Sequence, residues 1–358
     1  MESRVSVLGS LLPEYADYAL IISGENRRDF TNFVSSSGYL LVTRKEAYLL
    51  VDFRYAEAAK KQAKGCKVVV FKKLEVTLKE ITAQHLLRDI MLEASACTLS
   101  EAERIDGIIR AAGGNTIKTA ELDRIIGRMR IIKTADEVDK MRQAQRITEE
   151  ALSDTVKLIK EGVTEKELAL ELEFNMRKNG ADGVAFDLIV LTGKNTSMPH
   201  GVPGYEKVKA GDFILFDIGA TVDGYHSDMT RTYVLGRADK QQLRLYNTVL
   251  EAHMAALEAV RSGVTCGYID DKARSYIDQA GFEGCFGHST GHGVGLEIHE
   301  APTVSPKNDF TLQNGMVITI EPGIYIPDKY GVRIEDMVVV SNSGCINLAT
   351  LPKELIVL

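Results

Sequence analysis

The stretch FILFDIGATVDGYHSDMTRTY, residues 213–233, decides how the C-terminal part of the chain folds. Two runs typical of β-strands flank Asp223-Gly224, and Asp-Gly is a strong signal for a hairpin turn. With the turn centred just before Asp223, Asp217 and Asp228 lie directly opposite each other on one face, with Cβ atoms about 5 Å apart. Like charges so placed are destabilising unless a positive group lies between them. Because apolar residues flank Asp217, a solvated surface position does not explain it, and the pattern predicts a bound divalent cation.

A second hairpin about a hundred residues later repeats this arrangement. Residues 316–340 read MVITIEPGIYIPDKYGVRIEDMVVV, with Glu321 and Glu335 placed symmetrically about Asp328. The pair Pro322-Gly323 is capable of inserting a bulge, so the register of this hairpin is less firmly indicated.

The segment between the hairpins, residues 288–300, reads HSTGHGVGLEIHE and adds a histidine to the carboxylates. Oxygen and nitrogen ligands of this kind suit Mn²⁺, Co²⁺, Fe²⁺ or Zn²⁺. Four carboxylates carry four negative charges, which two divalent ions neutralise, and paired strands hold such ligands rigidly. The sequence therefore predicts a metal site formed by Asp217, Asp228, Glu321, Glu335 and a histidine of this segment.

The four carboxylates and His292, in the strings FDIGA, SDMTRT, GHGVGL, IEPG and RIED, resemble the ligand set of the "pita-bread" metallopeptidases, and this resemblance implies that His292 is the fifth metal ligand. That family includes methionine aminopeptidase, prolidase (Xaa-Pro dipeptidase) and aminopeptidase P. The resemblance covers roughly residues 130–358. It implies an α+β fold in which residues 129–358 form a pita-bread catalytic domain with a pseudo-two-fold repeat.

Residues 1–128 are expected to form a separate, smaller α/β domain. Short apolar runs at 38–43 and 47–52 predict a hairpin, and further strands and helices follow to residue 99. The string at residues 30–59 resembles the creatinase/prolidase-like N-terminal domain of prolidases and aminopeptidases P, although it has Thr-Asn-Phe where Thr-Gly-Phe is usual. Methionine aminopeptidases generally lack this domain, so its presence favours the proline-specific branch.

Capping signatures predict where the helices of the C-terminal domain begin. Thr134–Glu137, Thr164–Glu167 and Asp239–Gln242 each begin a helix, and a fourth helix is expected over about 267–281. The domain is thus expected to contain two helices followed by strands, twice. Each half contributes one carboxylate hairpin to a shared central site.

The resemblance also implies the roles of individual residues. Two divalent ions are expected, Mn²⁺ or Co²⁺ first and Zn²⁺ or Fe²⁺ as alternatives. Arg333 is expected to bind a substrate carboxylate or to pair with the acidic cluster, and Tyr325 to line the site or to be an ordinary strand tyrosine. The predicted catalytic residues are His200, His299 and Glu321, and the predicted substrate-binding residues are His288, Arg333 and Tyr325.

The expected function is hydrolysis of the Xaa-Pro bond at the N-terminus of dipeptides or short peptides, by a homodimer. The choice between dipeptidase and aminopeptidase stays open. The alternatives are a methionine aminopeptidase-like enzyme and a non-catalytic pita-bread binding protein. A net charge of −7 gives no reason to expect nucleic-acid or anionic-membrane partners. The five cysteines lack CxxC spacing, which suits reduced thiols in a cytoplasmic protein, and no signal peptide or membrane span is expected.

Overall fold

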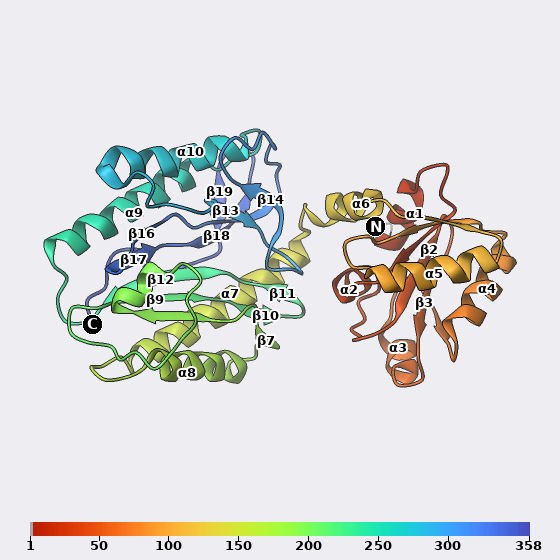
Figure 1. The fold of residues 1–358 in the computed structure, drawn as a ribbon, viewed down its shortest axis with the longest axis horizontal. Helices are drawn as coiled ribbons and strands as arrows, with labels where there is room; N and C mark the ends of the chain where they lie inside the picture. The colour runs from red at the N-terminus through yellow and green to blue at the C-terminus, as the bar shows by residue number, and fades with distance from the viewer. Residues whose placement is uncertain (1–2) are drawn as a thin grey trace. The chain divides into compact units, whose positions relative to one another are not determined.

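Short apolar runs in the first part of the chain build one mixed sheet in the computed structural model (Figure 1). The structure describes residues 3–358, which divide into two units between Met129 and Arg130. In the first unit the strand order is β4-β3-β2-β1-β5-β6, and the antiparallel pairing of β2 with β3 confirms the expected hairpin. The strands are β1 (Tyr18–Ile21), β2 (Tyr39–Thr43), β3 (Ala47–Val51), β4 (Lys67–Val70), β5 (Asp89–Leu92) and β6 (Asn115–Ile117).

Helices cover both faces of this sheet. Consecutive residues of β2 point to opposite faces of the sheet, so Leu40 and Leu41 belong to different apolar clusters. The cluster of Leu40 includes residues of α1, α2, α3 and α6, and the cluster of Leu41 includes residues of α4 and α5. Because both faces are buried, the strands read as continuous apolar runs. The helices are α1 (Arg4–Leu11), α2 (Gly24–Thr31), α3 (Ala56–Gln62), α4 (Leu74–His85), α5 (Leu99–Ala111) and α6 (Glu121–Arg130).

The second unit contains the four expected helices, and all three capping boxes form. In each box the cap side chain accepts a backbone N–H at the third helical residue, whose own side chain accepts the cap N–H. No helix among residues 3–358 combines the length and apolarity needed to cross a membrane. The helices are α7 (Ala135–Val156), α8 (Glu165–Lys178), α9 (Lys240–Ala259) and α10 (Cys266–Ile277).

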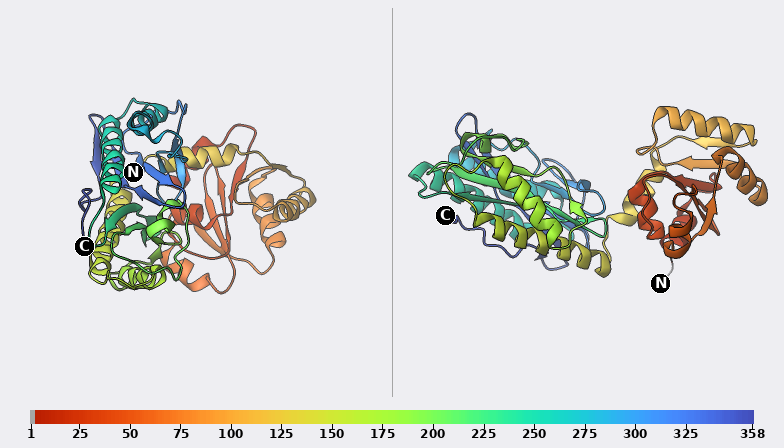
Figure 2. Two further views of the ribbon diagram at one scale, coloured as in Figure 1. Left: turned by 60° about the vertical axis from the view of Figure 1, so that its left-hand side comes forward. Right: turned by 90° about the horizontal axis from the view of Figure 1, so that it is seen from below.

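Strands lie between the two helix pairs. One apolar cluster joins α7 and α8 to the first half of the strands, and another joins α9 and α10 to the second half, so that the helix pairs lie on opposite sides in Figures 1 and 2. The first-half strands are β7 (Gly183–Val184), β8 (Ile189–Thr192), β9 (Phe213–Ile218), β10 (Ala220–Val222), β11 (Tyr225–His226) and β12 (Met229–Val234). The second-half strands are β13 (Gly291–Gly293), β14 (Glu300–Val304), β15 (Val317–Ile320), β16 (Gly323–Ile326), β17 (Tyr330–Arg333), β18 (Asp336–Val340) and β19 (Cys345–Asn347).

The first carboxylate hairpin forms, but the predicted register was wrong. Asp217 pairs with Thr230 rather than with Asp228, because the turn is centred between Asp223 and Gly224. Both turn residues have positive φ, 48° and 75°, as a two-residue type I′ turn requires. The partner shifts by two residues, and a shift of two leaves every side chain on its original face. The two aspartates therefore lie diagonally on one face instead of directly opposite.

The register of the second hairpin agrees with the prediction, and no bulge displaces it. Ile320 pairs with Asp336 and Gly323 with Arg333, so one register runs through both halves of the hairpin. The ladder is interrupted at the glutamates. The Glu321 N–H donates to the Thr290 carbonyl at 2.7 Å, and the Glu335 N–H donates to the Thr230 carbonyl at 3.1 Å. The second bond ties this hairpin to the first and brings their acidic faces together.

Candidate metal centre and catalytic cleft

A cleft of about 1080 Å³ in the second unit gathers nearly all of the predicted site residues. Its base is acidic, and its walls are partly apolar. Tyr325 does not line the cleft but lies directly behind it, hydrogen-bonded to two residues that do. The predicted residues that line the cleft are His200, Asp217, Asp228, His288, His292, His299, Glu321, Arg333 and Glu335.

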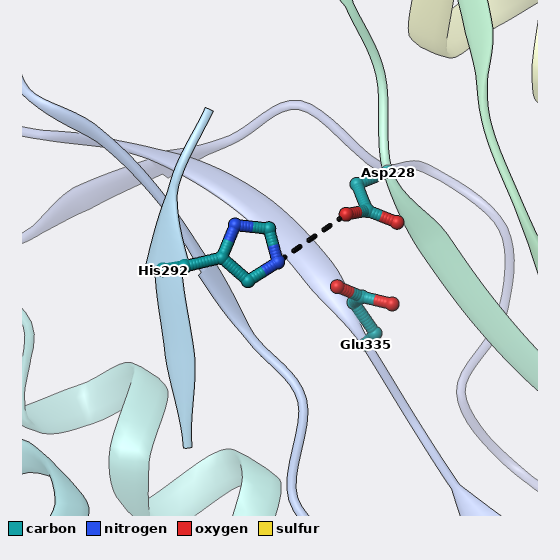
Figure 3. A group of neighbouring side chains, drawn as sticks. All are labelled: Asp228, His292 and Glu335. Carbon is teal, nitrogen blue, oxygen red and sulfur yellow. Dashed lines mark ion pairs between the residues drawn. The ribbon is translucent and has the colours of Figure 1, made fainter. Parts of the chain in front are cut away.

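Three of the expected ligands converge on one point (Figure 3). One ligand atom from each of Asp228, His292 and Glu335 lies within 4.8 Å of the others. The His292 Nε2 atom lies 3.5 Å from the Asp228 carboxylate and 3.4 Å from the Glu321 carboxylate. The cluster thus combines two carboxylates with an imidazole and has a third carboxylate beside it.

The glycines on either side of His292 let β13 pass close to its neighbours. A Cβ atom at position 291 would lie 1.9 Å from the Thr319 carbonyl oxygen, and one at position 293 would lie 2.2 Å from the Ala301 carbonyl oxygen. The His292 Nδ1 atom is 3.0 Å from the Gly293 carbonyl oxygen and donates to it. That hydrogen bond leaves the lone pair on Nε2, facing the carboxylates, as a metal ligand requires.

Burial and mutual repulsion perturb the acidic groups strongly. The pKa values of Asp228 and Glu335 are raised well above their usual range, first by burial and then by the neighbouring carboxylates. Burial also raises the pKa of Glu321 to about 8 and lowers the pKa of His292. Without a cation the site therefore binds protons on its acids and keeps its imidazole neutral.

Arg333 holds the acidic cluster in position. Its Nη2 atom donates to the Asp217 carboxylate, and its Nε atom donates to the Thr230 hydroxyl at 3.1 Å. The Thr230 hydroxyl in turn donates to the Glu335 carboxylate at 2.7 Å. Arg333 is 2% exposed. Arg333 was expected either to bind a substrate carboxylate or to pair with the acidic cluster, and its contacts in the structure are those of the second role.

A second chain of hydrogen bonds joins Arg333 to His288. The Arg333 Nη1 atom donates to the Tyr325 hydroxyl at 2.6 Å, and that hydroxyl lies 2.9 Å from His288 Nε2. His288 Nδ1 donates to the Ser289 carbonyl at 2.9 Å, so Nε2 accepts from the tyrosine. Burial lowers the pKa of His288 to about 4, which keeps its imidazole neutral.

The two histidines expected to act on substrate both line the cleft. The His299 ring lies against the His292 ring, with centroids 4.4 Å apart, and burial lowers the pKa of His299. His200 is exposed and stands in the loop between β8 and β9. These positions leave both side chains available to a molecule bound in the cleft.

The sequence analysis missed Glu300, the residue that follows His299 and holds this part of the chain in place through ion pairs. Glu300 also lines the cleft, and its carboxylate pairs with Arg130 and, at 3.0 Å, with Lys133. The Glu300 side chain is 7% exposed and that of Lys133 is 2% exposed. Glu300 lies about 170 residues along the sequence from both Arg130 and Lys133, so no local pattern could reveal these ion pairs. The role of Thr230 was accessible in principle, because it lies two residues from Asp228 on the same strand face.

Comparison with known proteins identifies the family. Residues 139–342 match metallopeptidase family M24, and residues 10–132 match the creatinase/prolidase N-terminal domain. The chain is 39% identical over 319 residues to the Xaa-Pro dipeptidase of Pyrococcus furiosus, with 89% of each chain covered.

Solved structures agree over almost the whole chain. The Xaa-Pro dipeptidase from Bacillus anthracis superposes with a TM-score of 0.93 at 37% identity and covers 99% of both chains. The X-Pro aminopeptidase from Thermotoga maritima gives 0.90 at 36% identity, covering 96% of this chain and 98% of the other. These matches confirm the expected pita-bread domain and the creatinase/prolidase-like α/β domain, and the chain belongs to metallopeptidase family M24.

Proposed function

We propose that this chain is a dinuclear-metal peptidase that hydrolyses the Xaa-Pro bond at the N-terminus of dipeptides and short peptides. The observation that carries the proposal is the convergence of Asp228, His292 and Glu335 at the base of a cleft. Similar proteins named Xaa-Pro dipeptidase and X-Pro aminopeptidase support the specificity. Because both names occur at similar identity, we propose activity on both substrate lengths.

The residues present fit the two divalent ions that membership of this family implies. Carboxylates and a neutral imidazole are the donors that such ions take. The four carboxylates carry four negative charges when ionised, and Arg333 offsets one of them. We propose that Asp217, Asp228, His292, Glu321 and Glu335 hold the ions, with Mn²⁺ or Co²⁺ as the first choice and Zn²⁺ or Fe²⁺ as alternatives. Bound there, the ions would supply an activated water and positive charge for the developing oxyanion.

The chain's own residues supply the proton transfers. Glu321, whose carboxylate lies 3.4 Å from His292 Nε2 among the metal-binding residues, can accept a proton from the attacking water and deliver it to the leaving amine. His299 and His200 can donate hydrogen bonds to the carbonyl oxygen as negative charge develops on it. Arg333 keeps the Asp217 carboxylate and, through Thr230, the Glu335 carboxylate in fixed orientations. Tyr325 stabilises that arrangement from behind through its hydrogen bonds to Arg333 and His288, and His288, which lines the cleft, contacts substrate at the cleft wall.

Hydrolysis of Ala-Pro and Ala-Pro-Ala tests the proposal, with Ala-Ala and Met-Ala-Ser as controls. Chelation should abolish cleavage of the proline peptides, and Mn²⁺ or Co²⁺ should restore it. Glu335→Ala should lose bound metal and activity together. Cleavage of Met-Ala-Ser without cleavage of the proline peptides would favour a methionine aminopeptidase-like enzyme. Stoichiometric bound metal without any hydrolysis would favour a non-catalytic binding protein. The proposed homodimer is checked by sedimentation equilibrium.

A further inference from the structure

The cleft continues away from the acidic base along an apolar wall. We define this wall as Leu170, Val184, Phe186, Leu188, Val202 and Ile298, all of which line the cleft. Two of these side chains reach the open surface: Leu170 is 61% exposed and Val202 is 83% exposed. Exposed apolar side chains that continue a cleft are typical of a ligand-binding groove.

The outer end of the wall is built from two elements. The cleft-lining residues of α8, among them Lys166, Leu170 and Glu173, recur at intervals of three and four, so they lie on one face of the helix. Val202 comes from the loop between η1 (Gly193–Ser197) and β9. The Lys166 ammonium ties α8 to this loop, because it lies 5.1 Å from the centre of the Tyr205 ring.

The size of the cleft exceeds what a dipeptide requires. Its volume of about 1080 Å³ lies just above the range of about 300–1,000 Å³ that is typical of pockets for drug-sized ligands. An extended peptide advances about 3.3–3.6 Å per residue, so two residues span only about 7 Å. In a peptidase that acts at a free N-terminus, a single residue precedes the scissile bond. A longer substrate can therefore extend only through the residues that follow proline.

We propose that Leu170 and Val202 form a subsite for an apolar side chain on the third residue of a peptide substrate. The inference rests on the proposed function and deepens it: the preferred substrates are short peptides of the form Xaa-Pro-apolar. The continuity of the wall with the acidic base supports a peptide as the occupant, because the same cavity reaches from the carboxylates to Leu170.

The test compares kcat/KM for Ala-Pro-Leu and Ala-Pro-Ala with the Mn²⁺-loaded enzyme. Partial burial of a leucine side chain predicts a preference of about tenfold for Ala-Pro-Leu. Leu170→Ala should reduce this ratio to below about threefold. Phe174→Ala is the matched control, because Phe174 is on the same helix and is 60% exposed but does not line the cleft. This control should keep the wild-type ratio.

Other results would overturn the inference. If Leu170→Ala changed only the preference between Leu-Pro-Ala and Ala-Pro-Ala, the subsite would belong to the first residue. If Leu170→Asp altered the association state while leaving the third-residue ratio intact, the surface would be an interface between copies of the chain. Cleavage of both peptides at equal rates by the wild type would sink the subsite and leave the proposed function standing. Failure to cleave any Xaa-Pro peptide would remove the proposed function itself.

Discussion

Removing the divalent ions should make the stability of the protein depend steeply on pH, through Glu321. The pKa of this carboxyl is raised from 4.5 to about 8, mainly by burial and partly by repulsion from Asp217. A raised pKa means that the folded state prefers the protonated form. Its stabilising contribution is therefore complete below pH 4.5 and is lost as pH rises through about 8.

The structure gives the size of the effect. One pKa unit corresponds to about 1.4 kcal/mol, so a shift from 4.5 to about 8 amounts to on the order of 5 kcal/mol for this largely buried group, whose side chain is 17% exposed. Native proteins are stable by only about 5–15 kcal/mol, so metal-free protein at alkaline pH should be markedly weakened. A divalent ion at a thousand times its Kd should restore about 4 kcal/mol.

The assay is urea unfolding of chelator-treated protein across pH 4.5–9, comparing the wild type with Glu321→Gln. The glutamine keeps the shape of the side chain but does not ionise, so the variant should gain stability relative to the wild type as pH rises. Comparing the two proteins isolates Glu321 from His253 and His288. Burial lowers the pKa of each histidine to about 4, and their contributions are lost in the opposite direction, as pH falls below about 6.5. Glu251→Gln, at an exposed position, is the control.

A difference between wild type and Glu321→Gln that stays constant from pH 4.5 to 9 would refute the reasoning, because it would show that Glu321 titrates alike in the folded and unfolded states. A difference that changes equally for Glu251→Gln would assign the effect to general surface charge instead.

Two further predictions concern catalysis. His299→Ala should keep near-normal metal content, measured by elemental analysis, while losing roughly 10²-fold or more in kcat, as expected for a group that donates to the oxyanion; a parallel loss of metal would make His299 a ligand. Arg333→Lys should weaken metal binding about 10–100-fold in a competitive chelator titration, because a compact ammonium lacks the planar fork whose three nitrogens contact Thr230, Tyr325 and Asp217; unchanged affinity would contradict the positioning role of Arg333.

Strand periodicity predicted the faces of the site better than its register. In the first hairpin the predicted turn centre was one residue too early, because a type I′ turn needs positive φ at both Asp223 and Gly224. The acidic face was nevertheless predicted correctly, since an error of two residues in the partner preserves alternation. In the second hairpin the symmetry about Asp328 gave the right register. At the ladder break beside Pro322-Gly323, the N–H groups of Glu321 and Glu335 donate to carbonyls outside the hairpin, and no extra residue is inserted.

Contacts between distant segments could not be predicted in the same way. A local pattern shows which side of a strand a residue occupies, but it does not show what faces that side. Arg333 and Asp217 are 116 residues apart, and Lys133 and Glu300 are 167 residues apart. The apolar wall was missed for a related reason. Leu170 is an ordinary apolar residue of an amphipathic helix until the neighbouring loop places Val202 across the same cleft.

Arg333 alters the charge argument from which the metal site was first inferred. Four clustered carboxylates suggested a need for four positive charges, yet one of them, Asp217, already pairs with this buried guanidinium. Thr230 passes the same constraint to Glu335 through its hydroxyl. The chain thus fixes Asp217 and Glu335 by its own contacts, one ligand from each hairpin. Three negative charges remain to be neutralised, and protons on the carboxyls with raised pKa values serve that purpose until metal displaces them. The metal-free fold is therefore arranged to receive cations while tolerating their absence at lower pH.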